Sequence, residues 1–154
     1  KPYCLLCPLQ ESCVALKENK VDILPIKLNK TKVRNRYFNY LVWLDGNGNT
    51  VLEQRKGKGI WQNLYQFPLL ETDGPLEDGE IEEKMKVNHT PLEIETLSLY
   101  NNEPIIPKLS HQHLHTHFWI LKTSHILEEG ISWKKIHDFP VPVLIADFIK
   151  TFKI

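Results

Sequence analysis

The sequence has little cysteine, no net charge and no long apolar segment, and each shortage excludes a class of protein. All three cysteines lie between Cys4 and Cys13 of a 154-residue chain, so no later cysteine could pair with them. An odd, clustered set argues against a secreted disulfide framework and indicates a reducing, intracellular compartment. No apolar run approaches the ~18–20 residues that span a bilayer, and no signal-peptide pattern opens the chain. We therefore expect no membrane partner.

The formal net charge is zero, but the charge is unevenly distributed along the chain. Residues 1–68 carry eleven Lys and Arg against five Asp and Glu, whereas residues 69–154 carry eight against fourteen. Such a chain cannot hold nucleic acid by bulk charge, although one basic face could do so. The alternative is that the asymmetry only aids solubility.

A short stretch of alternating basic residues offers such a face. In an extended strand every second side chain points to the same side, so these charges would line up toward phosphates. An exposed edge strand that is protected by its charge is an equally good interpretation. The candidate phosphate contacts are Lys30, Lys32, Arg34 and Arg36.

The chain divides into three parts by composition. Residues 1–18 form a Cys-bearing segment, residues 19–30 read as a linker that contains Pro25, and residues 31–154 alternate between strand and helix patterns. Because the first residue is Lys1 rather than Met, we expect a fragment or a processed product.

The pattern of residues 31–154 predicts an α+β fold, a mixed or antiparallel sheet with about two helices packed on it. The Asp-Gly-Asn-Gly-Asn run at residues 45–49 is typical of a tight turn, and we expect it to close a hairpin. The expected strands are 37–44, 50–54, 94–100 and 114–122, and the expected helices are 77–87 and 143–152.

The spacing Cys4-x2-Cys7-x5-Cys13 is the most specific motif in the chain. Zinc ribbons use two C-x2-C pairs and two-cluster ferredoxins use C-x2-C-x2-C-x3-C, so neither pattern fits. The spacing resembles the last three ligands of the C-x6-C-x2-C-x5-C loop that holds a [4Fe–4S] cluster in helix-hairpin-helix DNA glycosylases. Reading back from Cys4 places the first ligand before Lys1. A cubane needs four thiolates, so we expect the cluster to be absent from this fragment. The alternative interpretation is that the three cysteines are unpaired thiols that bind no metal.

Four blocks of the sequence, in their order and spacing, resemble the A/G-specific adenine DNA glycosylases of the MutY family. The cysteine loop is followed by Leu24-Pro25-Ile26-Lys27, which is similar to that family's linker. Gly59-Ile60-Trp61-x3-Tyr65-x-Phe67-Pro68 resembles its G-L-W-x-F-P segment, and Leu109-Ser110-His111 stands where the family has Phe-Ser-His. With Phe139-Pro140-Val141-Pro142, the resemblance extends through nearly the whole chain.

The resemblance implies a Nudix-like carboxy-terminal domain that recognises 8-oxoguanine opposite adenine in duplex DNA. The adenine is flipped into the amino-terminal domain of the same full-length chain, where its N-glycosidic bond is cleaved. That domain holds the family's catalytic acids, so no catalytic residue is assigned here. The implied lesion reader is Leu109, Ser110 and His111, and the implied cluster ligands of the full-length glycosylase include Cys4, Cys7 and Cys13. The implied location is the bacterial cytoplasm, on the nucleoid.

The Nudix hydrolase motif, G-x5-E-x7-R-E-U-x-E-E-x-G-U, is broken in this chain. Gly74 and Glu80 fit its first part, but the positions of R-E-U-x-E-E read Asn88-His89-Thr90-Pro91-Leu92-Glu93. One acid of the metal-binding set remains, and Pro91 would interrupt the helix that should carry it. We therefore expect the fold without a functional Nudix box, and a metal-dependent hydrolase is the least favoured function.

Histidines alternate between positions 111 and 117 and would share one face of a strand. Two or three such side chains can bind zinc, so a metal site is the alternative to a polar face with His111 nearest the DNA. No Asp or Glu lies between Pro104 and Thr123 to complete a ligand set. These histidines are His111, His113, His115 and His117.

The aromatic side chains carry a separate expectation. We expect the four tryptophans in the core: Trp43, Trp61, Trp119 and Trp133.

The sequence therefore predicts a DNA-binding module of a repair glycosylase, whose partners are the lesion-bearing duplex and the amino-terminal catalytic domain. A protein-interaction module on the same fold is the alternative. The two differ in whether binding follows the lesion and weakens with salt.

Catalysis by this chain alone gives the first test. Because neither the glycosylase acids nor a complete Nudix box is present, we expect no adenine excision and no hydrolysis of 8-oxo-dGTP. Alkali-sensitive strand breaks at adenine opposite 8-oxoguanine measure the first activity, with a full-length glycosylase as positive control. Release of pyrophosphate measures the second, and either product at a rate proportional to protein concentration would contradict the expectation.

Overall fold

The computed structural model describes residues 2–26, 32–77, 79–88 and 93–154, and the contacts divide the chain into two compact units, Lys1–Lys32 and Val33–Ile154. The first unit consists of the 3-10 helices η1 (Cys4–Leu6) and η2 (Gln10–Ser12) and the short α-helix α1 (Val14–Lys17). Every described side chain in it is exposed or only half-buried. This unit therefore has no closed core among its described residues.

The second unit is built on a four-stranded mixed sheet with the strand order β5-β1-β7-β6. The strands β1 (Arg34–Asp45) and β7 (Gln112–Thr123) lie in the middle and pair in parallel along their whole length. The strands β5 (Leu69–Thr72) and β6 (Thr96–Leu99) pair antiparallel with β1 and β7 on the outer sides. The expected mixed sheet and its expected strands at 94–100 and 114–122 are confirmed.

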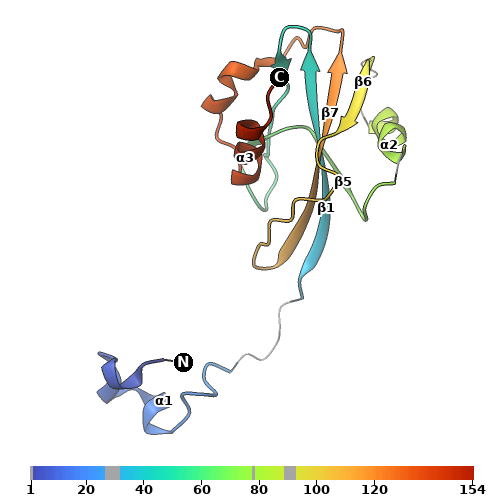
Figure 1. Ribbon diagram of the computed structural model, residues 1–154. Helices are drawn as coiled ribbons and strands as arrows, with labels where there is room; N and C mark the ends of the chain where they lie inside the picture. Colours follow the sequence, from blue (N-terminus) through green and yellow to red (C-terminus); the bar gives the residue numbers. More distant parts are fainter. Residues whose placement is uncertain (1, 27–31, 78, 89–92) are drawn as a thin grey trace. The chain divides into compact units, whose positions relative to one another are not determined.

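The two central strands are covered on both faces, and their sequences reflect this. From Phe38 to Asp45 every residue of β1 is buried, because helices cover both sides of strands that pair in parallel. In β7, buried residues alternate with half-buried ones as far as Ile120. Figure 1 shows α2 (Glu80–Asn88) on one side of the sheet and α3 (Val143–Thr151) on the other.

Helix α3 closes the larger of the two cores. Its apolar face is buried, and Pro142 stands at its N-cap. Phe148 lies flat against Phe118 of β7, with ring centroids 4.1 Å apart and an interplanar angle of 4°. A buried side chain of this size contributes roughly 1.5–3 kcal/mol, so this contact is a large part of what holds α3 on the sheet. The buried residues of α3 are Leu144, Ile145, Phe148 and Ile149.

Helix α2 lies on the opposite face, and among its described side chains Ile81 and Met85 are buried. Its first turn is acidic, which suits the positive end of the helix dipole. The expected helix at 77–87 is confirmed, whereas Pro91, expected to end it, lies outside the described residues. The expectation for the tryptophans holds in full for Trp43, which is buried in the core under α2. The other three are half-buried and pack against a core, Trp119 against the one under α2 and Trp61 and Trp133 against the one under α3.

The expected hairpin of residues 37–54 is wrong. The chain does turn at residues 45–49, but β2 (Asn49–Thr50) pairs with β8 (Ile131–Ser132), and β3 (Glu53–Gln54) pairs with β4 (Tyr65–Gln66). Neither returns along β1, because β5 and β7 already occupy its two edges. The 3-10 helix η3 (Trp133–Asp138) follows β8 and leads to α3. None of the described helices is long and apolar enough to cross a membrane.

The buried carboxylate of Asp45 organises the turn that directs the chain away from β1. Its Oδ1 accepts hydrogen bonds from the backbone N–H groups of Asn47 (2.9 Å) and Asn49 (2.8 Å). Its Oδ2 accepts from the Asn49 amide (2.9 Å) and from the Leu127 N–H (3.3 Å), so the turn is joined to the segment after β7. Burial alone would raise the pKa of Asp45, but these hydrogen bonds lower it below its ordinary value.

Replacing Asp45 with Asn tests this role. One side-chain oxygen then becomes an N–H₂ group facing donors, and we expect a loss of about 1–3 kcal/mol in the free energy of unfolding at pH 7. Because the folded-state pKa is depressed, the carboxylate stabilises the fold above its unfolded value of about 3.9, and this contribution is lost as the pH falls through the folded value. Urea unfolding at neutral and acid pH measures both, with D138N at an exposed site as control. A D45N variant as stable as the control at pH 7 would contradict the assignment.

Candidate functional site

The predicted lesion reader lies at the tip of a hairpin. The segment 104–108 runs antiparallel beside the first half of β7, with Ile105 opposite Thr116 and Lys108 opposite His113. The N–H of Leu109 donates to the carbonyl of Gln112 over 2.8 Å, which leaves Ser110 and His111 between them at the turn, both exposed. Leu109 is half-buried and packs against the α3 core. The three residues are thus brought together, with Leu109 turned inward and the other two outward.

The approach to the tip is more regular than the sequence suggested. Pro104 and Pro107 lie in this segment, yet it pairs with the outer edge of β7. The carbonyl of Pro107 accepts a hydrogen bond from the Leu114 N–H over 3.2 Å, and an edge position tolerates a residue that has no N–H to donate. Asn101 completes the ladder: its side chain accepts from the Phe118 N–H (2.9 Å) and donates to the Thr116 carbonyl (2.9 Å).

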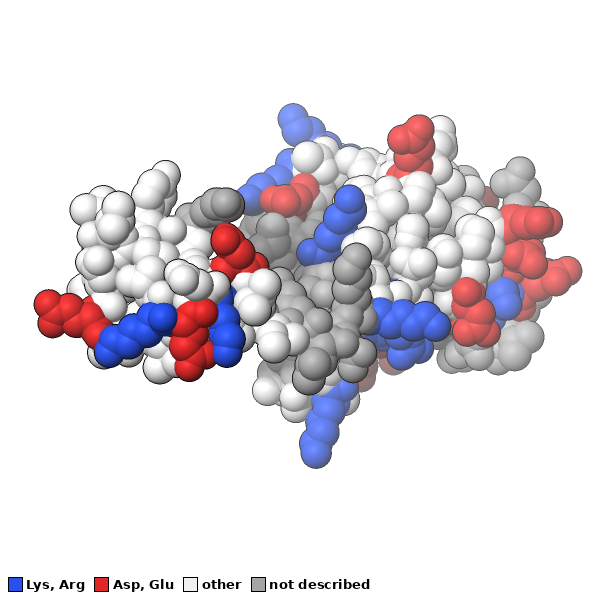
Figure 2. Space-filling view, turned by 90° about the horizontal axis from the view of Figure 1, so that it is seen from below, with Lys and Arg blue, Asp and Glu red and all other residues white. Residues whose placement is uncertain are grey.

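The start of β1 lies directly beside the tip. The N–H of Arg34 donates to the carbonyl of His111 over 3.0 Å, and Arg34 is the register partner of Gln112. Arg34 and Lys32 are exposed, while Lys30 lies outside the described residues. Figure 2 looks at this end of the sheet and shows basic side chains there, with acidic side chains grouped on the side where Figure 1 places α2.

Arg36 differs from the other basic residues of the stretch because its guanidinium is occupied. Nε and Nη2 donate to the two carboxylate oxygens of Glu71, each over 2.6 Å, and Nη1 donates to the side-chain oxygen of Gln112 over 3.0 Å. These hydrogen bonds lower the pKa of Glu71 and raise that of Arg36. The guanidinium also lies 4.7 Å from the centroid of the Phe38 ring.

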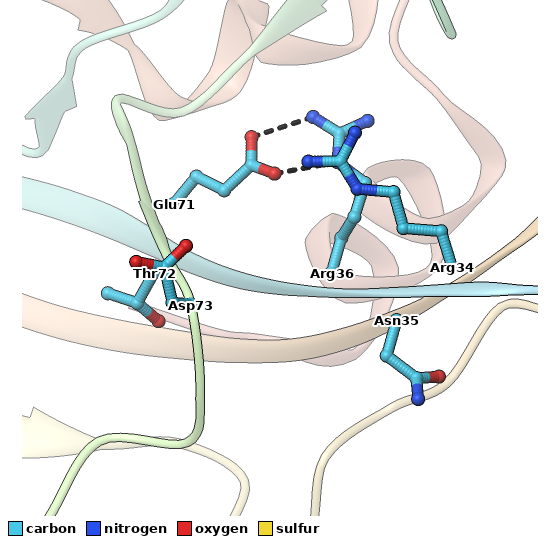
Figure 3. A pocket seen from close by; sticks show the side chains of 6 residues that line it. All are labelled: Arg34, Asn35, Arg36, Glu71, Thr72 and Asp73. Carbon is cyan, nitrogen blue, oxygen red and sulfur yellow. Dashed lines mark hydrogen bonds and ion pairs between the residues drawn. The ribbon is translucent and has the colours of Figure 1, made fainter.

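A polar pocket opens beside this ion pair, lined by residues at the start of β1 and the end of β5. Figure 3 shows the carboxylate of Glu71 facing the guanidinium of Arg36, with Arg34 reaching toward the same region from the next position on that face. The charge of Arg34 contributes to the lowered pKa of Glu71, which places the two within electrostatic reach. The lining residues are Arg34, Asn35, Arg36, Glu71, Thr72 and Asp73.

The histidines of β7 share one face, but on the side opposite the arginines. His115 stacks on Tyr37 of β1 with ring centroids 4.8 Å apart, and its Nε2 lies 3.4 Å from Asn35 Oδ1. Burial lowers the pKa of His117. In the described ranges no group of three or more His, Cys, Asp or Glu is placed to hold a metal ion, so the zinc alternative has no geometric support.

The three cysteines are likewise not arranged as a metal site. Cys4 and Cys13 are half-buried, Cys7 is exposed, and all are free thiols. Within the described residues they do not form a cluster of potential ligands, and a cubane would need a fourth thiolate.

One acid of the incomplete Nudix box takes part in a hydrogen bond of the fold. The carboxylate of Glu80 accepts a hydrogen bond from the Glu77 N–H over 2.9 Å, which fixes the start of α2. Glu93 is exposed and lies 3.6 Å from His125. Neither acid is assembled with others into a metal-binding group among the described residues.

Sequence reasoning missed Glu71 and Gln112. The sequence pattern gave neither residue a role. They lie 35 and 76 residues from Arg36 in the chain, and nothing in the local pattern indicates that they meet it.

Comparison with known proteins fits this geometry. The NUDIX domain family matches residues 39–151. The adenine DNA glycosylase of Buchnera aphidicola subsp. Schizaphis graminum is 28% identical over 160 residues, which cover 99% of this chain and 44% of that protein. That of Buchnera aphidicola subsp. Acyrthosiphon pisum is 31% identical over 68 residues, 44% of this chain and 19% of that protein. The complex of the C-terminal domain of mouse MUTYH with human PCNA has a TM-score of 0.56 at 14% identity, covering 76% of this chain and 86% of that chain.

The chain belongs to the NUDIX domain family, and its fold is the α+β Nudix fold with a mixed sheet. Within that family it resembles the C-terminal NUDIX-like domain of adenine DNA glycosylases of the MutY type, and its similarity to the first Buchnera relative extends over nearly its whole length. The chain spans less than half of the first of these relatives, 44%.

Proposed function

We propose that this domain recognises 8-oxoguanine opposite adenine in duplex DNA, so that the amino-terminal domain of a full-length glycosylase excises the adenine. In that protein the loop with Cys4, Cys7 and Cys13 would carry the [4Fe–4S] cluster together with a fourth cysteine. The setting of that protein would be the bacterial cytoplasm. The observation that carries the proposal is the exposed Ser110–His111 turn, held at the end of a paired hairpin beside a basic strand end.

The chemistry of the lesion suits such a tip. 8-Oxoguanine differs from guanine by a carbonyl oxygen at C8 and a proton on N7, so an acceptor becomes a donor at that edge. The Ser110 hydroxyl can accept from N7–H, and its backbone N–H can donate. A hydroxyl also rotates to suit plain guanine, so the fixed backbone around the turn has to supply most of the discrimination. The hydrogen bonds of Leu109 and His111 with their neighbours give the turn that rigidity.

Phosphate contacts would come from the neighbouring strand end. Arg34 is exposed and makes no side-chain hydrogen bond with any described residue, so its charge is free for a phosphate oxygen. Lys32 precedes it and is exposed as well. Such contacts position the duplex without reading its sequence, whereas the tip reads the base.

A protein-interaction role is the second candidate. The structurally similar C-terminal domain of mouse MUTYH was solved in a complex with human PCNA. Titration of duplexes that hold 8-oxoguanine:adenine or guanine:adenine separates the two functions, because DNA binding should follow the lesion and fall with salt. Equal, salt-independent binding of both duplexes would favour the protein partner.

The double variant S110A/H111A in the full-length glycosylase tests the reader. We expect the preference for 8-oxoguanine over guanine opposite adenine to fall about tenfold, because one such base contact is worth about 1–3 kcal/mol. Single-turnover excision of adenine should remain measurable, since the catalytic acids lie in the other domain.

The chain supplies a matched control for this experiment. Ser124 and His125 form the same dipeptide just beyond the opposite end of β7, and both are exposed. S124A/H125A should leave the preference unchanged. If S110A/H111A retained the full preference as well, these residues would not be the reader.

A further inference from the structure

Arg34 and Arg36 have the same charge and lie two positions apart on one face of β1, but their surroundings differ. The Arg34 side chain is exposed and contacts the ion pair only through its charge. The Arg36 side chain is 17% exposed and joins three elements by hydrogen bonds. A phosphate that bound Arg36 would have to displace Glu71 from two charge-assisted hydrogen bonds, which are the strong kind. Arg36 is therefore poorly placed to bind DNA directly.

The contacts of Arg36 lead to the reading tip in two further steps. Glu71 of β5 holds the guanidinium from one side, and Nη1 donates to the side chain of Gln112, the first residue of β7. The Gln112 carbonyl in turn accepts from the Leu109 N–H and closes the turn that carries Ser110 and His111. A planar guanidinium with a bidentate carboxylate has a fixed orientation. The tip is thereby joined to two strands of the sheet.

The ring of Phe38 supports the guanidinium of Arg36 as a third contact, besides Glu71 and Gln112. It is fully buried, and the guanidinium of Arg36 lies over it at 4.7 Å from the centroid. Arg36 is therefore held by a carboxylate, an amide and an aromatic face, an arrangement that a flexible Lys could not reproduce.

We propose that Arg36 is a positioning residue for the lesion reader and not a phosphate contact: it holds the Ser110–His111 turn in its reading orientation through Gln112, with Glu71 fixing its guanidinium. The inference rests on the proposed function. Arg34 remains the residue of this pair that meets phosphate. The two roles predict opposite effects on two measurable quantities, the lesion preference and the salt dependence of binding.

The test compares R36M, Q112A and R34M in the full-length glycosylase. For each, binding to duplexes with 8-oxoguanine:adenine and guanine:adenine is measured over a range of salt concentrations. R36M and Q112A should lower the preference for 8-oxoguanine about fivefold, within the range of one base contact, and keep the wild-type slope of log K against log salt. R34M should keep the preference and lower the steepness of that slope by about 0.9, the value for one lost phosphate contact.

If R36M unfolds, Q112A still tests the inference. It removes the hydrogen bond between Arg36 and the Gln112 side chain and leaves the Arg36–Glu71 pair intact. Amide hydrogen exchange gives a readout that needs no DNA: the Leu109 N–H should exchange faster in R36M and Q112A than in R34M. A loss of salt slope in R36M, or an unchanged preference in both R36M and Q112A, would overturn the inference. If S110A/H111A also kept its preference, the proposed function itself would fail; if only S110A/H111A lost it, the reader would stand and the positioning role would fall.

Discussion

The parallel pairing of β1 with β7 is the contact on which the rest of the unit depends. Each strand is 12 residues long, and every residue of one has a partner in the other. Parallel strands begin at the same end of a sheet, so the start of β1 necessarily lies beside the start of β7. That pairing brings Arg34 to the carbonyl of His111 and Arg36 to the side chain of Gln112. At the other end it brings Asp45 to the N–H of Leu127.

The same pairing separates two motifs that look alike in the sequence. Even-numbered residues of both strands face α3, and odd-numbered residues face the side of α2, as the two cores show. Arg34 and Arg36 therefore share a face with Phe38, whereas His113, His115 and His117 lie on the opposite face with Asn35 and Tyr37. A basic surface and a histidine surface on opposite faces do not form one site. His111, in the turn that precedes β7, lies beside the start of β1, where Arg34 is exposed.

The Nudix fold is present here although the sequence of the Nudix box departs from the hydrolase pattern. Helix α2 follows β5 and closes one face of the sheet with Ile81 and Met85. Its leading acid, Glu80, accepts a backbone hydrogen bond at the helix start, and no metal-binding group is found among the described residues. A fold can persist when its site is lost, because core packing and catalysis depend on different side chains.

The local pattern of the sequence determined the features that depend on local physics. The sequence pattern predicted the helix at residues 143–152, where α3 lies, and the Gly-rich run after β1 predicted a turn. The return of a hairpin strand was wrong, because strand partners are chosen by long-range pairing: parallel β7 occupies the edge that a hairpin would have used. Only the tertiary structure decided that Glu71 and Gln112 meet Arg36, because contacts between residues 35 and 76 positions apart leave no periodicity in the sequence.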